Sequence, residues 1–481
     1  MRFTLFIKFI SISYQSLKCL SSEANRCMIK FMKRSLTFDL NQEIGKIVLL
    51  RGWVERVRSH GKIAFFDLRD RDGNIQVAAF DELASKVSEL GVQDVVEVEG
   101  LVKSRDEKYI NKDNPTGSIE IELKSLKVIV KSHEMPFDMG GKDLNLELPT
   151  LLDFRALTLR HNKVAPIFKV QEKIIDAFRK ALQEKDFTEF QSPVLIPQPA
   201  EGGAEVFEVK YFGHTVYLSQ SPQFYKQILV GVFERVFSVN KTLRAEPSVT
   251  TRHLTEVTTL DAEMGFIDSW EDVMDIAEYT IKHILSAVEK DLPAILSQFE
   301  ATVPQVSEKI PRIKLREAQK IIQDRTGRNV LSEPDLSPDD EREICKWSLE
   351  EKGSDLVFVT HYPVEKRPFY TFEDPENPGY TLSFDLLGRG VEWMTGGQRI
   401  NEYEKLVNNA KKRGIDINKS ELYLQAFKYG IPPEGGFSFG SERIVMHILG
   451  LSNIREASLF PRDMERVDER FSVLEKEKHE E

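Results

Sequence analysis

Residues 383–399 read SFDLLGRGVEWMTGGQR, which is two short strand-like runs around a turn. A two-residue turn at Gly388 and Arg389 predicts a β-hairpin in which Asp385 lies opposite Glu392. Like charges that face each other destabilise a sheet, so this pairing needs a cation. Because Mg²⁺ is commonly held by one or two carboxylates plus phosphate oxygens, the hairpin predicts a metal and nucleotide site on a sheet. The alternative is that Arg389 neutralises both acids.

The residues that follow the two acids fit the same kind of site. Thr395 could add an oxygen to the metal, and Gly396 and Gly397 would let a ligand approach the backbone closely. Arg399 would then face an anion beside the metal.

The composition of the chain predicts a packed multidomain protein. Of its 481 residues, 41% are hydrophobic and 30% are charged, which favours two to four folded domains over disorder. The net charge of −11 argues against a generally basic nucleic-acid binder but allows a local basic groove. Three cysteines, at positions 19, 27 and 345, are too few and too scattered for a disulfide framework or a zinc site, and they fit a reducing compartment.

The first 35 residues differ from the rest of the chain. They contain seven Lys or Arg and a single acid, Glu23, as a targeting leader would. The apolar run is broken by Lys8 and lacks a clear cleavage site, so we favour an extension, with the first domain starting near Met28 or Met32. No other segment has the ~18 apolar residues needed to cross a membrane. We expect a cytoplasmic protein, with import into an organelle if residues 1–35 are a leader.

Residues 36–134 contain short strand-like runs, beginning with KIVLLRGWV at Lys46. Three such runs, a helix-like DELASKVSEL and two further strands predict a five-stranded barrel of the OB type. In the last strand, Ile119, Ile121 and Leu123 alternate with acids, as in a half-buried strand. Residues 135–163 resemble a hinge, and residues 164–481 form a second domain with a charged helical insertion at about 270–350.

Two stretches of the second domain predict sites for anions. In TLRAEPSVTTRHLTEVTTLDAEMGF (242–266), Arg244 ends a strand, and Arg252 and His253 lie in a polar loop that could fold over a polyphosphate. In GGFSFGSERIVMHILGL (435–451), Arg443 lies in the first turn of a helix, where the N-terminus also favours anions. Taken singly, the first could be an ordinary surface hairpin and the second an ordinary helix start.

A third stretch predicts a site for a small acid. In QSPQFYKQ, Gln223 and Lys226 lie three residues apart on one helical turn, where one ligand could reach both. A solvated helix start is the alternative. Together, the three stretches and the hairpin suit in-line attack of a carboxylate on a nucleotide phosphate, with catalysis by positioning and charge neutralisation.

These stretches resemble the motifs of class II aminoacyl-tRNA synthetases. FTEFQSPVLIP (187–197), LRAE with RH (243–253) and GGFSFGSER (435–443) look like motifs 1, 2 and 3 of the family. QSPQFYKQ, TGGQRI and NIREASLFPRD (453–463) resemble the aspartate-specific members. The likeness covers about residues 37–465 and is similar to the compact archaeal and eukaryotic form, although the barrel stretch looks closer to bacterial forms.

The resemblance implies an α+β multidomain fold, with an OB barrel for the anticodon and a catalytic domain whose mainly antiparallel sheet is flanked by helices. It implies ATP-dependent ligation of L-aspartate to tRNA through an aspartyl-adenylate, with Mg²⁺, in a homodimer whose interface includes Pro193. In the site, Arg244 would hold the α-carboxylate of aspartate and the α-phosphate of ATP. Lys226 and Arg399 would bind the side-chain carboxylate of aspartate.

The resemblance also implies sets of site residues. The residues implied to contact aspartate are Glu201, Gln223, Lys226, Arg244, Asp261, Thr395 and Arg399. Those implied for ATP are Arg244, Glu246, Arg252, His253, Leu254, Glu392, Gly440, Ser441, Glu442 and Arg443. The catalytic residues are Arg244, Arg443 and Glu392, and Mg²⁺ would be held by Glu392 and Thr395 with support from Asp385. Many relatives carry an aromatic residue near Val257, so adenine stacking differs here.

The barrel would read the tRNA anticodon. Phe65 would stack on a splayed base, with Arg58 and Gln76 on its neighbours, as expected for single-stranded RNA loops on an OB face. The alternative for Phe65 is a core position beside Phe66. His60 resembles the form that charges both tRNA(Asp) and tRNA(Asn), and we favour that reading over an idle turn histidine.

Three alternatives remain at this point. The protein could charge tRNA(Asp) alone, it could be an asparagine-specific ligase, or it could be an RNA-binding paralogue without catalysis. The last would be expected to have lost Arg244, Glu392 or Arg443, and all three are present. An asparagine enzyme would not need Lys226 and Arg399 together.

Overall fold

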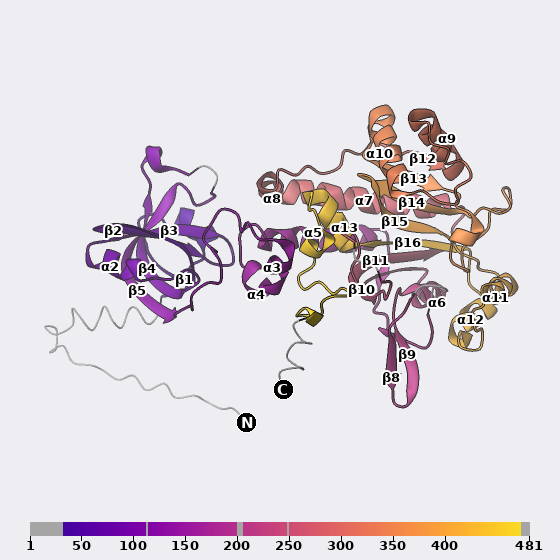
Figure 1. The fold of residues 1–481 in the computed structure, drawn as a ribbon, viewed down its shortest axis with the longest axis horizontal. Helices are drawn as coiled ribbons and strands as arrows, with labels where there is room; N and C mark the ends of the chain where they lie inside the picture. The colour runs from indigo at the N-terminus through magenta and orange to yellow at the C-terminus, as the bar shows by residue number, and fades with distance from the viewer. Residues whose placement is uncertain (1–31, 112–113, 200–204, 248–249, 473–481) are drawn as a thin grey trace, which may run out of the picture. The chain divides into compact units, whose positions relative to one another are not determined.

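The computed structural model describes residues 32–111, 114–199, 205–247 and 250–472 (Figure 1). The chain divides into two compact units between Asn145 and Leu146. Most of the proposed extension, residues 1–31, lies outside the described residues, and so does Glu201. Within the described part of the chain, none of the helices has the length and apolar character to cross a bilayer.

The first unit is a closed five-stranded barrel with strand order β1-β2-β3-β5-β4, which confirms the predicted OB fold (Figure 1). Ile119 and Ile121 point into the barrel core, while Glu120 between them is half-buried, as the alternation predicted. The elements are β1 (Ile47–His60), β2 (Ile63–Arg69), β3 (Asn74–Phe80), α2 (Glu82–Ser88), β4 (Val95–Ser104) and β5 (Ile119–Val130).

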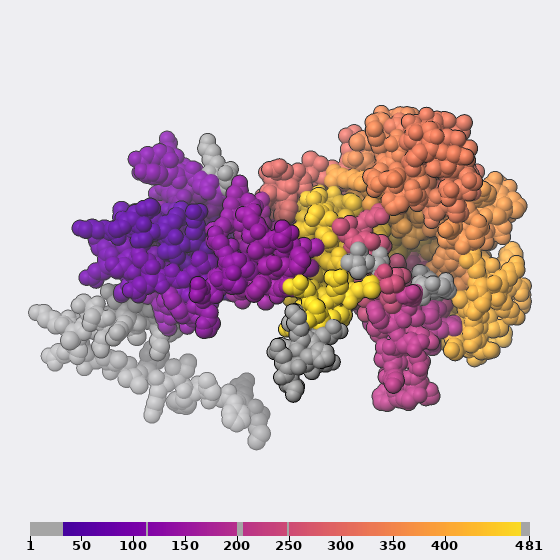
Figure 2. All heavy atoms as spheres, in the orientation of Figure 1, coloured from indigo at the N-terminus to yellow at the C-terminus, as the bar shows by residue number. Residues whose placement is uncertain are grey.

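The second unit is built on an eight-stranded sheet, which is antiparallel except for the pairs β12–β13 and β10–β6. In sheet order, the strands are β12 (Arg312–Lys314), β13 (Leu356–Thr360), β14 (Ser383–Gly388), β15 (Val391–Gln398), β16 (Glu434–Gly440), β11 (Glu256–Gly265), β10 (Arg235–Leu243) and β6 (Thr188–Glu189). A small sheet holds β7 (Leu195–Ile196), β9 (His214–Leu218) and β8 (Glu208–Tyr211). Its β8–β9 hairpin projects from the surface of this unit (Figure 2).

Helices cover one face of the large sheet, and the candidate site lies on the opposite face. The apolar residues of α5, α7 and α13 form one core with the sheet, including a stripe of α5 at Ile167, Val170, Ile174, Phe178 and Leu182. The helices of this unit are α3 (Leu148–Asp153), α4 (Arg155–Thr158), α5 (Ala165–Gln183), α6 (Gln223–Phe233), α7 (Glu271–Asp291), α8 (Pro293–Gln298), α9 (Leu315–Thr326), α10 (Pro338–Lys352), α11 (Tyr403–Lys412), α12 (Glu421–Lys428) and α13 (Ser441–Leu449).

The β14–β15 hairpin forms as predicted, but its predicted register is wrong. The turn lies at Arg389 and Gly390, both with positive φ, and Leu387 pairs with Glu392. Such a turn matches the twist of a hairpin, and Gly390 adopts the conformation without strain. A bulge then leaves Trp393 unpaired, so that Asp385 lies opposite Thr395 instead of Glu392.

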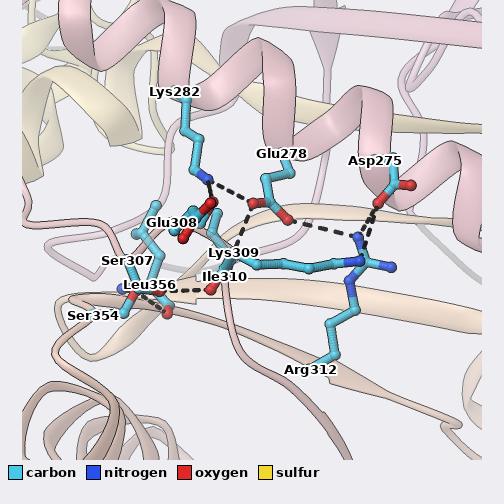
Figure 3. Close-up of polar contacts among 10 residues, drawn as sticks. All are labelled: Asp275, Glu278, Lys282, Ser307, Glu308, Lys309, Ile310, Arg312, Ser354 and Leu356. Carbon is cyan, nitrogen blue, oxygen red and sulfur yellow. Dashed lines mark hydrogen bonds and ion pairs between the residues drawn. The ribbon is translucent and has the colours of Figure 1, made fainter.

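Ion pairs fasten the edge strand β12 to α7 (Figure 3). Glu278 on α7 accepts hydrogen bonds from Lys282 at 2.6 Å and from the backbone of Ile310 at 3.0 Å. Arg312 on β12 pairs with Asp275 and lies 3.6 Å from Glu278. Acids and bases of this cluster neutralise one another, so we interpret it as a structural link between α7 and β12.

Candidate active site

One end of the site is a buried cluster of charges that includes three of the predicted aspartate-binding residues. Lys226 projects from α6, and its Nζ lies 3.3 Å from Asp261 Oδ1 and 3.0 Å from Glu263 Oε2. Arg399, directly after β15, donates through Nε to Glu263 Oε1 at 2.8 Å. Lys226 is only 1% exposed. The alternation of side chains along β11 places both acids on the polar face of that strand, opposite Leu260 and Met264.

Glu263 joins the two cations, and the sequence analysis gave it no role. Burial alone would raise the pKa of Glu263, but the attraction of Arg399 and then of Lys226 outweighs burial and lowers it. The carboxylate therefore stays ionised and holds both cations side by side. Its position two residues after Asp261, on the same face of the strand, was the signal that could have identified it.

Glu434 is a second buried acid that the sequence analysis missed. Its Oε1 accepts a hydrogen bond from Gln227 at 2.8 Å, and Tyr423 donates to the same Gln227 at 3.0 Å. Burial raises the pKa of Glu434 well above its ordinary value, and the nearby charge of Glu263 raises it further. The buried surroundings of Glu434 thus favour its neutral form over the carboxylate.

The other end of the site gathers the cations predicted to bind ATP. The pKa of His253 is lowered by burial and then by the nearby Arg443 and Arg252, with a smaller effect from Arg244. Arg443 donates to the backbone oxygen of Glu392 at 2.7 Å, and its guanidinium lies 3.7 Å from the Glu392 carboxylate. The structure therefore brings residues from the loop after β10, from β15 and from α13 to one place.

Four further residues implied to contact ATP instead make contacts within the protein: Leu254, Gly440, Ser441 and Glu442. Glu442 accepts the backbone N–H of Thr258 at 3.0 Å and thereby joins α13 to β11. Ser441 donates to Glu442 at 3.1 Å, and Gly440 is the N-cap of α13. Leu254 packs in a small apolar cluster with Met446 and Ile454. These residues shape the site by fixing its backbone.

Arg367 occupies the place where the hairpin predicted metal ligands. It donates to Asp385 Oδ2 at 2.7 Å and to Thr395 Oγ1 at 3.1 Å. Arg389, the alternative partner, instead donates to the backbone oxygens of His447 and Thr302, so that alternative was wrong. Arg367 lies outside the motifs, and only the tertiary structure reveals it.

Two carboxylates at this place fit a divalent cation. Asp385 Oδ1 is buried and has no hydrogen-bond partner among the described residues. Burial, and then the charge of Asp385, raises the pKa of Glu392. Within the described residues, no three His, Cys, Asp or Glu side chains are placed to hold a metal alone. Phosphate oxygens would therefore have to complete the coordination shell, as is usual for Mg²⁺.

Glu341 reaches this end of the site from α10 of the helical insertion. Its carboxylate lies 3.7 Å from the guanidinium of Arg252. Burial, and then the nearby Glu392, raises the pKa of Glu341 to about 7. The sequence gives no sign that α10 approaches Arg252, because Glu341 and Arg252 lie about 90 residues apart in the chain. The end of the site that holds Arg252, His253 and Arg443 is called the nucleotide end below.

The barrel carries a separate cavity of about 950 Å³. All four residues predicted to read the anticodon, Arg58, His60, Phe65 and Gln76, line it. Phe66 is fully buried in the core, so the alternation leaves Phe65 for the cavity.

The polar residues of the cavity are linked to one another. Arg58 donates to Asp67 at 2.9 Å and to Gln76 at 3.2 Å, while Gln76 donates to Glu120 at 3.0 Å. The orientation of the Gln76 amide is thereby fixed before any base is bound.

Comparison with known proteins agrees with this geometry. Residues 147–464 match the model of the tRNA synthetases class II (D, K and N), and residues 48–129 match the OB-fold nucleic acid binding domain. The chain therefore belongs to the class II tRNA synthetases of the D, K and N group, which confirms the resemblance.

Curated relatives match over nearly their whole length. The chain is 39% identical to the aspartate--tRNA(Asp/Asn) ligase of Deinococcus radiodurans, covering 91% of this chain and 99% of the relative. It is 37% identical to the aspartate--tRNA(Asp) ligase of Pyrococcus abyssi, covering 90% and 98%. The structure resembles that of asparaginyl-tRNA synthetase from Pyrococcus horikoshii with asparaginyl-adenylate, with a TM-score of 0.83, 32% identity and coverage of 91% and 99%.

Proposed function

We propose that this protein ligates L-aspartate to tRNA in two steps, through an aspartyl-adenylate. The observation that carries the proposal is the buried pair of cations, Lys226 and Arg399, held together by Glu263 beside Asp261. Two fixed positive charges suit the side-chain carboxylate of aspartate. They favour aspartate over asparagine, because a carboxylate forms charge-assisted hydrogen bonds with both cations and a neutral amide does not.

The first step needs the α-carboxylate of aspartate in line with the α-phosphate of ATP. Arg244, which directly follows β10, would hold both groups, and Asp261 and Gln223 would receive the amino group. Arg252, His253 and Arg443 offset the charge of the triphosphate. Fixed cations of this kind act mainly by orienting the reactants and by stabilising charge that develops in the transition state.

Mg²⁺ would be held by the carboxylates of Glu392 and Asp385, and it would supply charge neutralisation of the phosphates. Thr395 is less suited to this role than the sequence implied, because Arg367 already donates to its hydroxyl. Glu246 lies beside the same cations, as its effect on the pKa of His253 indicates. We keep Glu201 as an aspartate contact from the sequence resemblance alone.

The barrel would select the tRNA by its anticodon, with Phe65 stacking and Arg58 and Gln76 contacting bases. We propose that both tRNA(Asp) and tRNA(Asn) are charged, supported by His60 on the cavity wall and by relatives named for both tRNAs. Relatives named for tRNA(Asp) alone support the strict alternative.

We also propose a cytoplasmic homodimer. Val232 and Phe233 at the end of α6 and Phe266 just after β11 are exposed, and their neighbouring residues are hydrogen-bonded, since Gly265 donates to Glu234. Exposed apolar groups of this size favour burial against a second chain. Motif 1, with Pro193, resembles the segment that forms this interface in the family.

ATP–pyrophosphate exchange with purified protein tests the first step. Exchange that depends on aspartate, and not on asparagine, is expected. Preference for asparagine would refute the pocket assignment. Charging of purified tRNA(Asp) and tRNA(Asn) then decides between the relaxed and the strict enzyme, and absence of aspartyl-tRNA(Asn) would refute the relaxed form.

A further inference from the structure

Arg367 is held on three sides at the nucleotide end of the site. It lies just after the short helix η4 (Val364–Lys366), and its side chain is 13% exposed. Its two terminal nitrogens donate to Asp385 and Thr395, which face each other on β14 and β15. Its guanidinium carbon lies 3.9 Å from the centre of the Tyr362 ring, which is itself buried. These contacts hold the guanidinium in one position, so it cannot move with a bound ligand.

The charge of Arg367 is permanent. Burial alone would lower its pKa, but the attraction of Asp385 more than compensates and the pKa is raised. At this end of the site, Arg367 therefore offsets part of the negative charge of Asp385 and Glu392 in the absence of any ligand. A bound divalent cation would lie close to this fixed positive charge and would be repelled by it.

We propose that Arg367 is a resident cation of the nucleotide site, which occupies Asp385 Oδ2 and the Thr395 hydroxyl and weakens divalent-cation binding in the absence of a phosphate ligand. It is a positioning residue, because it fixes Asp385 Oδ2 and leaves Asp385 Oδ1 and Glu392 for a metal. Only the identity of the phosphate ligand rests on the proposed function. Binding of the cation to the nucleotide-free protein does not depend on which amino acid is activated.

Mn²⁺ binding to the nucleotide-free protein, followed by the electron paramagnetic resonance of free Mn²⁺, tests this proposal. Arg367→Met removes the charge, and we expect Mn²⁺ to bind about tenfold more tightly, because a nearby unit charge acts strongly in a partly buried site. Mn²⁺ should also raise the Tm of this variant more than that of the wild type. Arg367→Lys keeps the charge, and its affinity should stay within about twofold of the wild type.

Two further variants locate the effect. In Arg367→Met/Glu392→Gln, the gain in affinity should disappear if the ion binds at this site. Arg312→Met is the matched control, because Arg312 also forms an ion pair with an acid and lies over an aromatic ring, that of Phe358, but in the cluster of Figure 3. It should alter stability without altering Mn²⁺ affinity.

A folded Arg367→Met protein with unchanged or weaker Mn²⁺ affinity would overturn the proposal. If this variant does not fold, Thr395→Val decides, since its hydroxyl is bound by Arg367 and its loss should leave Mn²⁺ affinity within about twofold. A large loss of affinity would instead make Thr395 a metal ligand and refute the proposal. Failure of pyrophosphate exchange in the wild type would refute the proposed function and leave the Mn²⁺ result standing.

Discussion

The two ends of the candidate active site share one sheet but treat charge differently. At the aspartate end, Lys226 and Arg399 pair with Glu263 at 3.0 and 2.8 Å, and all three side chains are buried. At the nucleotide end, Arg252 and Arg443 are about one-third exposed, and each lies 3.7 Å from its nearest acid. The charges of the aspartate end neutralise one another within the protein, whereas the cations of the nucleotide end lie farther from acids.

This difference follows from the ligands that each end would bind. A small amino acid of fixed shape is best selected by charges that are already oriented and desolvated, since reorganisation would lower both affinity and selectivity. A triphosphate with a divalent ion is larger and more strongly charged, and exposed arginines can adjust to it. Arg367 is the exception at the nucleotide end, since it is as enclosed as the charges of the aspartate end.

The largest effect should come from breaking the aspartate end at Glu263. In Glu263→Gln, Lys226 and Arg399 lose their shared anion, and removal of one partner from a buried ion network typically costs about 3–5 kcal/mol. Urea unfolding should show this loss, and pyrophosphate exchange should show a raised KM for aspartate. The exposed Glu404→Gln, on α11, is the control and should stay within about 0.5 kcal/mol of the wild type. Equal stability of the two variants would contradict the view that this end is neutralised internally.

Removing the stacking residue of the barrel should give the next largest effect. Phe65→Ala should raise the KM for tRNA by about 5- to 100-fold, because base–aromatic stacking contributes ~1–3 kcal/mol. Pyrophosphate exchange should not change, since the barrel does not form the site for aspartate. Phe38→Ala is a suitable control, because Phe38 is exposed but does not line the cavity. Similar losses in both variants would argue against stacking by Phe65.

Glu341 allows the nucleotide end to be tested by pH. Its pKa is raised to about 7 in the folded state from an ordinary value of 4.5, so the folded protein binds its proton more tightly. Its contribution to stability is complete below pH 4.5 and is lost as the pH rises through 7. Between pH 5 and 8, the wild type should lose on the order of 1 kcal/mol more than Glu341→Gln. Denaturant titrations at several pH values measure this, and parallel curves would refute the shift.

The smallest effect is expected at His60 on the wall of the barrel cavity. His60→Leu should reduce charging of tRNA(Asn) relative to tRNA(Asp) by about fivefold, the scale of a single hydrogen bond. The ratio of kcat/KM for the two tRNAs is the measurement. An unchanged ratio would show that His60 does not affect selection between the two tRNAs and that other residues of the cavity determine it.

The sequence was sufficient where local patterns carry the information. Alternation in β5 reflects the period of two residues along a strand, which depends on the backbone alone. These patterns predicted the barrel and the faces of the strands. The motifs predicted that Lys226, Arg244, Arg399 and Arg443 would share one site, and the structure brings their strands and helices together.

Sequence reasoning failed where a single residue changes the geometry. The register of the β14–β15 hairpin depends on which two residues form the turn and on the bulge at Trp393. A Cβ on Gly388 would come within 2.5 Å of Leu356 and 3.0 Å of the Trp393 ring, so the close packing of this hairpin requires a glycine there. Neither feature has a local signature.

By itself, the sequence determined the two domains, the polar and apolar faces of their elements and the family to which the chain belongs. Only the tertiary structure decided which charges neutralise which: Glu263 between two cations, Arg367 on Asp385, and Glu341 beside Arg252. The physical reason is that pairing energies depend on separations of a few ångström and on burial, and both are set by contacts between segments far apart in the chain.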